Sequence, residues 1–156
     1  MAFSIESSAF DDGGQIPAVH TCEGADRSPE LGWEDAPAGT RSFALIVEDP
    51  DAPGGTFIHW VLYDLPAASK GLAAGLAKEP TLPGGARQGM TGFGRIGYRG
   101  PCPPPGDGYH RYFFRLMALD VESLGLAPGA SAKAVEEAAR GHVIGEATLV
   151  GRYRRF

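Results

Sequence analysis

The chain has 156 residues, 43% of them hydrophobic and 21% charged, which is enough for one domain with a sizeable core. Its formal net charge of -5 argues against a partner that is nucleic acid or an anionic membrane surface. The 23 glycines and 13 prolines favour many turns and short strands over long helices.

The N-terminal residues show no basic region followed by an apolar core, and no apolar run approaches the length of a membrane span. We therefore expect a cytoplasmic protein. Because cytoplasmic thiols stay reduced, Cys22 and Cys102 are expected to be free, although the sequence is compatible with a disulfide. The cysteines lack a CxxC spacing or a nearby histidine pair, so we expect no metal and no other cofactor.

The first half of the chain predicts several strands. Alternating side chains indicate a short strand over residues 3–7. Residues 16–21 read as another strand, which Pro17 would place at a sheet edge. Residues 42–48 and 57–65 are apolar on both faces and predict buried strands.

The middle of the chain predicts loops. Residues 66–83 lack a helical period and predict a long surface loop, with one helical turn near residues 73–77. Residues 84–100 contain seven glycines, whose entropy cost is typical of places where backbone closely approaches another group.

The last third predicts a strand, a helix and a strand. Residues 109–120 form a third strong apolar run. Ser131 is a candidate N-cap for a helix over residues 132–140, which Gly141 would end. Residues 146–153 predict a final strand, so the pattern favours a mainly β, sandwich-like fold.

An unusual motif, Asp49-Pro50-Asp51-Ala52-Pro53, follows the strand at residues 42–48. Proline restricts both itself and the residue before it, so the two carboxylates lie on a stiff turn. Stiff loops on rigid scaffolds often carry function. The alternative is a surface turn whose aspartates bond their own backbone. The sharp reversal also predicts a cis peptide bond at Asp49–Pro50 or Ala52–Pro53.

Two histidines lie within predicted strands. A period of two places His59 on the same face as Val61 and Tyr63, and His110 on the same face as Tyr112. A single histidine on an apolar face is usually a core residue. Because each of these follows a proline-stiffened or glycine-rich loop, we regard both as candidates for a site.

These motifs resemble the phosphatidylethanolamine-binding protein family, and most closely its bacterial, Raf kinase inhibitor-like branch. The resemblance covers nearly the whole chain. Arg99 departs from the bacterial pattern, which often has glycine there, and adds a charge near the mouth of the expected pocket. The stretches that carry the resemblance are residues 28–33, 36–40, 49–53, 59–60, 97–104, 110–112 and 142–153.

The resemblance implies a β-sandwich of two antiparallel sheets with one or two short helices near the C-terminus, formed by residues 1–156 as a single domain. It also implies a small pocket for anions of the phosphate type. The residues implied to bind the ligand are Asp49, Asp51, Ala52, His59, Gly100, Pro101, Pro103, His110 and Tyr112.

We therefore expect a protein that binds a small phosphorylated or otherwise anionic ligand, without a catalytic residue. One alternative is a phosphoester hydrolase that uses an Asp–His pair as general base. Within it, Asp49, Asp51, His59 and His110 are plausible metal ligands. Another alternative is an inhibitor that binds a kinase or a protease through its surface. Relatives suggest a homodimer, which exposed strand edges would favour.

The expected pocket poses a charge problem. With neutral histidines its two aspartates carry about -2, and a phosphate ~5 Å from one carboxylate is repelled by roughly 3 kcal/mol. A protonated histidine would offset this charge, or a monoanionic ligand could donate its own P–OH. We therefore predict binding that weakens from about pH 5.5 to 8, favours phosphate monoesters over sulfate, and is mostly lost in His59→Ala and His110→Ala.

Overall fold

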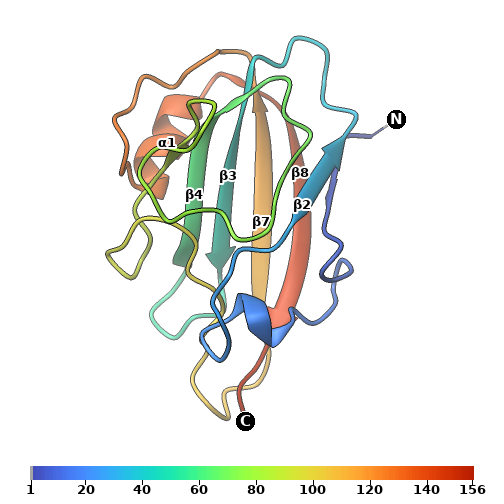
Figure 1. The fold of residues 1–156 in the computed structure, drawn as a ribbon, viewed down its shortest axis with the longest axis vertical. Helices are drawn as coiled ribbons and strands as arrows, with labels where there is room; N and C mark the ends of the chain where they lie inside the picture. The colour runs from blue at the N-terminus through green and yellow to red at the C-terminus, as the bar shows by residue number, and fades with distance from the viewer. Residues whose placement is uncertain (1) are drawn as a thin grey trace.

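The computed structural model describes residues 2–156 as two antiparallel sheets with a helix (Figure 1). This confirms the predicted mainly β fold. The smaller sheet has the order β1 (Ser4–Glu6), β2 (Leu31–Glu34), β5 (Gly71–Leu72). The larger sheet has the order β6 (Arg87–Gln88), β4 (Phe57–Pro66), β3 (Ser42–Asp49), β7 (His110–Leu119), β8 (Val143–Tyr153).

Strand β3 of the larger sheet is buried on both faces, which explains why the predicted strand at residues 42–48 is apolar at odd and even positions. Phe43 and Leu45 of β3 pack in one core cluster with Trp33 of the smaller sheet. Ala44 and Ile46 belong to a second cluster, which includes the helix. The domain therefore has three layers, and β3 lies in the middle one.

Helix α1 (Ala132–Ala139) lies close to the predicted residues 132–140. The Ser131 side chain accepts a hydrogen bond from the Ala134 N–H, as expected of an N-cap. Val135 and Ala139 are buried against the larger sheet. After the helix, Gly141 adopts a φ of +84°, which agrees with the predicted helix end.

Two local predictions are wrong. Residues 16–21 do not form a strand: the 3-10 helix η1 (Ala18–His20) lies there, and the Thr21 hydroxyl closes the turn on the Ala18 carbonyl. No helical turn forms at residues 73–77. The side-chain amide of Gln88 instead donates to the carbonyls of Ala77 and Glu79, which holds this loop in an extended path.

A β-bulge changes the face on which His59 lies. Val47 pairs with Trp60 and Glu48 with Ile58, so His59 is an extra residue on β4. Period two predicted that His59 shares a face with Val61, which packs toward α1. The bulge instead brings its ring to 5.2 Å from the Tyr112 ring, between centroids, so the predicted face is wrong.

The predicted cis bond is also wrong, since residues 2–156 contain no cis peptide. The chain after β3 reverses by other means. The Asp51 N–H donates to Asp49 Oδ1, which forms an Asx-turn. Gly55, with a φ of +104°, then donates its N–H to the Ala52 carbonyl.

Cys22 and Cys102 form a disulfide, so the prediction of two free thiols is wrong. The bond joins the segment after η1 to the proline-rich loop at residues 101–105. Both segments lie at the end of the sheets where β3 ends and β7 begins, near the C-terminus (Figure 1). The disulfide therefore connects two loops at the same end as the predicted site.

Candidate functional site

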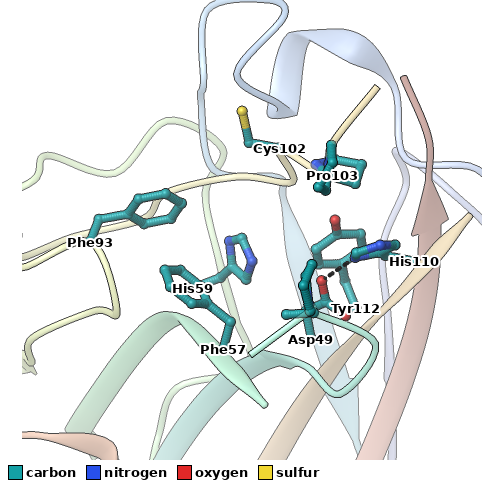
Figure 2. A pocket seen from close by; sticks show the side chains of 11 residues that line it. Asp49, Phe57, His59, Phe93, Cys102, Pro103, His110 and Tyr112 are labelled. Carbon is teal, nitrogen blue, oxygen red and sulfur yellow. Dashed lines mark hydrogen bonds and ion pairs between the residues drawn. The ribbon is translucent and has the colours of Figure 1, made fainter. Parts of the chain in front are cut away.

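A cavity of about 230 Å³ lies at this end of the larger sheet (Figure 2). This volume is below the range of pockets for drug-sized ligands, so the cavity suits a small group. Its lining comes from the end of β3 and the turn after it, the beginnings of β4 and β7, and the loop at residues 93–104. The lining residues are Asp49, Ala52, Pro53, Phe57, His59, Phe93, Cys102, Pro103, Pro104, His110 and Tyr112.

His110 lies between two carboxylates. Its Nδ1 is 2.7 Å from Asp49 Oδ2, and its Nε2 is 2.6 Å from Asp107 Oδ2. A carboxylate only accepts hydrogen bonds, so both ring nitrogens donate when the ring is an imidazolium. Burial lowers the pKa of His110, but the hydrogen bonds to Asp107 and Asp49 outweigh it and raise the pKa above its usual value. The site therefore holds a positive charge beside Asp49.

His59 has the opposite character. Its Nδ1 lies 2.7 Å from the Arg99 carbonyl oxygen, so Nδ1 carries the proton and Nε2 remains an acceptor in the neutral ring. The Arg99 N–H also donates to the His59 carbonyl. Burial lowers the pKa of His59, and the hydrogen bond to Arg99 opposes this only in part. His59 is therefore the neutral, accepting histidine of the site.

The Tyr112 hydroxyl is a donor without an acceptor. Its oxygen is buried and has no hydrogen-bond partner among the residues that the structure describes. Burial, followed by the nearby Asp49, raises the pKa of Tyr112, so the hydroxyl keeps its proton. An unpaired buried polar group costs about 1–3 kcal/mol, and such a group at a cavity is available for a ligand.

Aromatic rings form the apolar side of the cavity. The Phe57 and Phe93 rings meet edge-on with centroids 4.7 Å apart, and both also pack against His59. A Cβ on Gly92 would lie 2.7 Å from the Phe57 ring, so this close approach requires glycine. These rings exclude water from one side of His59, which contributes to the burial that lowers its pKa.

The structure brings six predicted site residues together around the cavity: Asp49, Ala52, His59, Pro103, His110 and Tyr112. Three others do not line it. Asp51 points to Arg111, whose backbone N–H, Nε and Nη2 all donate to its carboxylate at 2.9 Å. The Arg111 side chain lowers the pKa of Asp51 to about 2. Asp51 therefore fastens the turn to β7.

The other two predicted residues form the backbone behind the cavity. The Gly100 N–H donates to Asp26 Oδ1, and the Pro101 carbonyl accepts from the Cys22 N–H. The resemblance also implied that the backbone of residues 100–103 forms one wall of the pocket, and Cys102 of this segment lines the cavity. Sequence reasoning missed four lining residues: Pro53, Phe57, Phe93 and Pro104. Phe93, between two glycines, carried a usable signal, because a large aromatic in a glycine-rich loop is unusual.

Within residues 2–156, the structure groups no three His, Cys, Asp or Glu side chains in an arrangement that could hold a metal ion. Over the same residues, no helix is long and apolar enough to cross a membrane.

Comparison with known proteins identifies the class. The profile of the phosphatidylethanolamine-binding protein family matches residues 6–154, and the chain belongs to this family. A UPF0098 protein of Aquifex aeolicus is 54% identical over 151 residues, which cover 97% of this chain and 88% of that protein.

A solved structure supports the same assignment. E. coli YbcL, described as a new member of the mammalian family, has a TM-score of 0.93 and 35% identity, with all of both chains covered. A relative in Mycobacterium tuberculosis that carries a lipoprotein name, LppC, is 40% identical over 96% of this chain and 71% of that protein. The bacterial resemblance read from the sequence is thus confirmed.

Proposed function

We propose that this protein binds a small ligand through a singly protonated phosphate group. The observation that carries the proposal is the pairing of an unpartnered donor, Tyr112, with an accepting nitrogen, His59 Nε2, at one small cavity. A phosphate monoanion offers an oxygen for the first and a P–OH for the second. Few other small groups offer both together with a negative charge.

The charge balance of the site also supports the proposal. The two carboxylates of the motif at residues 49–53 posed the problem of repulsion. Asp51 is neutralised by Arg111 outside the cavity, and Asp49 is paired with the His110 imidazolium. Because Asp107 also contacts this imidazolium, the group of Asp49, Asp107 and His110 sums to about -1. Asp107 lies outside the cavity lining, so the repulsion of an anion in the cavity is smaller than that expected from two free carboxylates.

The proposal is tested by comparing methyl phosphate with methyl sulfate by calorimetry. Methyl sulfate has the same shape but no proton to donate to His59. We expect methyl phosphate to bind at about pH 6 and to weaken as pH rises toward 8, because it loses its P–OH in that range. Methyl sulfate should bind weakly at every pH. Equal affinities that do not change with pH would contradict the proposal.

Variants localise the binding. Tyr112→Phe removes the hydroxyl without changing the core, and we expect it to lower affinity by about tenfold, the value of one hydrogen bond to a charged group. Tyr109→Phe is the matched control, since its hydroxyl contacts Gln15 outside the cavity. His59→Ala and His110→Ala should each remove most of the affinity.

Hydrolysis finds less support at this site. The sulfur of Cys102 is bonded to Cys22 and is not available as a nucleophile, and the lining contains no serine, threonine or lysine. The same samples of methyl phosphate, followed by phosphorus NMR, report any release of inorganic phosphate. Turnover that is lost in His59→Ala would replace the binding proposal with the hydrolase alternative.

A cytoplasmic location stays a prediction. The Cys22–Cys102 disulfide and the lipoprotein name of the mycobacterial relative both favour an oxidising compartment instead.

A further inference from the structure

A second cavity adjoins the first. It has a volume of about 270 Å³, and its lining includes the Cys22–Cys102 disulfide, Asp26, Phe93, Arg95 and Arg99. Phe93 and Cys102 line both cavities, so they form the partition between them. Figure 2 shows these two side chains along one side of the first cavity, and Phe93 is 45% exposed. A ligand held in the first cavity can therefore extend past the Phe93 ring into the second.

The second cavity carries uncompensated positive charge. Neither Arg95 nor Arg99 forms a salt bridge with any residue from 2 to 156, and Arg99 Nε is buried without a hydrogen-bond partner in that range. Asp26 is already engaged: its Oδ1 accepts from the Gly100 N–H and its Oδ2 lies 3.7 Å from Lys78 Nζ. Lys78 and Asp26 offset one another, which leaves the two guanidinium groups.

The backbone that carries both arginines is held in place. The Arg95 carbonyl accepts hydrogen bonds from the N–H and the hydroxyl of Thr91. The Arg99 peptide groups contact His59 through two hydrogen bonds. Between them, the buried Tyr98 hydroxyl donates to the His20 carbonyl. Because the backbone at both arginines is already fixed, an anion that binds between their side chains would cost less conformational entropy than one bound by a flexible loop.

We infer that the second cavity is a further anion subsite, and that the natural ligand carries two anionic groups. The inference rests on the proposed function for the first group, the protonated phosphate beside Tyr112 and His59. The second group, a carboxylate or another phosphate, lies between Arg95 and Arg99, whose planar guanidinium groups match either anion. The ligand class is thus a phosphorylated small acid or a bisphosphorylated small molecule.

The test compares two series of compounds by calorimetry at about pH 6. One series consists of phosphonoalkanoates, whose spacer grows one methylene at a time. The other consists of alkylphosphonates of equal length that lack the carboxylate. At one spacer length we expect the phosphonoalkanoate to bind about tenfold more tightly than its partner, as for a hydrogen-bonded ion pair. This preference should fall steeply in about 1 M salt.

Variants assign the preference to the arginines. Arg95→Gln and Arg99→Gln should each reduce this preference by about three- to fivefold. Arg95→Gln should leave the affinity for the alkylphosphonate within about twofold. Arg99→Gln keeps the backbone carbonyl that accepts from His59, so it should lower the affinity for the alkylphosphonate less than that for the phosphonoalkanoate. Arg140→Gln, which removes one charge at the end of α1, is the matched control and should change neither quantity. The Nε–H NMR signal of Arg99 should shift with the phosphonoalkanoate and not with the alkylphosphonate.

Two results would overturn the subsite. One is a wild-type protein that shows no preference at any spacer length. The other is a preference that survives in the Arg95→Gln/Arg99→Gln double variant. In both cases binding of the alkylphosphonate would leave the proposed function intact, whereas a protein that binds neither series would overturn the first site and the second together.

Discussion

The two histidines of the site illustrate how identical side chains acquire opposite roles. His59 meets a carbonyl and aromatic rings, so burial lowers its pKa and it accepts. His110 meets Asp49 and Asp107, so its pKa is raised and it holds a charge. Asp49, His59, His110 and Tyr112 could be predicted from the sequence, but their roles could not. The Arg99 carbonyl that fixes the tautomer of His59 is 40 residues away, and Asp49 and His110 are 61 residues apart. The alternation of side chains along a strand likewise does not predict the β-bulge at His59.

Asp107 is predicted to maintain the charge on His110. In Asp107→Asn, burial is opposed mainly by Asp49, so the pKa of His110 should fall, as measured by an NMR titration of its ring. A histidine whose pKa is raised by folding stabilises the folded protein below its unfolded pKa of about 6.5, and this stabilisation is lost as pH rises through its folded pKa. The variant should therefore lose about 1 kcal/mol of unfolding free energy at pH 6 and little at pH 9.

Asp120→Asn is the control for this experiment, since Asp120 contacts the exposed His142. An unchanged His110 titration in Asp107→Asn would show that Asp107 does not determine the charge of the site.

At the level of elements, local pattern predicted the long strands and α1 because their apolar residues repeat along one segment. The short strand β1 was predicted from its alternating residues, but β2, β5 and β6 were missed because distant residues hold them. Leu31 of β2 pairs with Leu72 of β5, and neither segment has a pattern of its own. The loop that precedes β6 depends on Gln88, whose side chain accepts from the Trp60 indole N–H and donates to two loop carbonyls.

Gln88→Leu is therefore predicted to be strongly destabilising. It leaves one buried donor and two carbonyls without partners, and we expect the free energy of unfolding to fall by about 3 kcal/mol or more in urea denaturation. Gln15→Leu, at an exposed glutamine, is the control and should stay within about 0.5 kcal/mol of the wild type. A loss below about 1 kcal/mol in Gln88→Leu would mean that the loop does not depend on this side chain.

For the whole molecule, the disulfide spans 80 residues and connects η1 with the cavity wall. No sequence pattern pairs Cys22 with Cys102; their proximity follows from the packing of loops from opposite halves of the chain. A disulfide that closes a loop of this length reduces the conformational entropy of the unfolded chain, so we expect it to stabilise the folded protein by about 2–4 kcal/mol.

The Cys22→Ser/Cys102→Ser variant is predicted to unfold at lower denaturant, with the free energy of unfolding reduced by that amount. Dithiothreitol should bring the wild-type protein to the same midpoint and leave the variant unchanged. A wild-type protein that does not respond to reductant would contradict a disulfide in solution.

The same bond gives the chain an unusual connectivity. The backbone from Cys22 to Cys102, with the sulfur bridge, is a closed covalent ring, and it contains seven of the eleven cavity-lining residues; Pro103, Pro104, His110 and Tyr112 lie outside. A single proteolytic cut in the long loop between β4 and β6 would open this ring without separating the two parts. On a denaturing gel, the nicked protein would migrate as one species without reductant and as two fragments with it. While the disulfide is intact, Asp49 and His110 stay in the same covalent molecule.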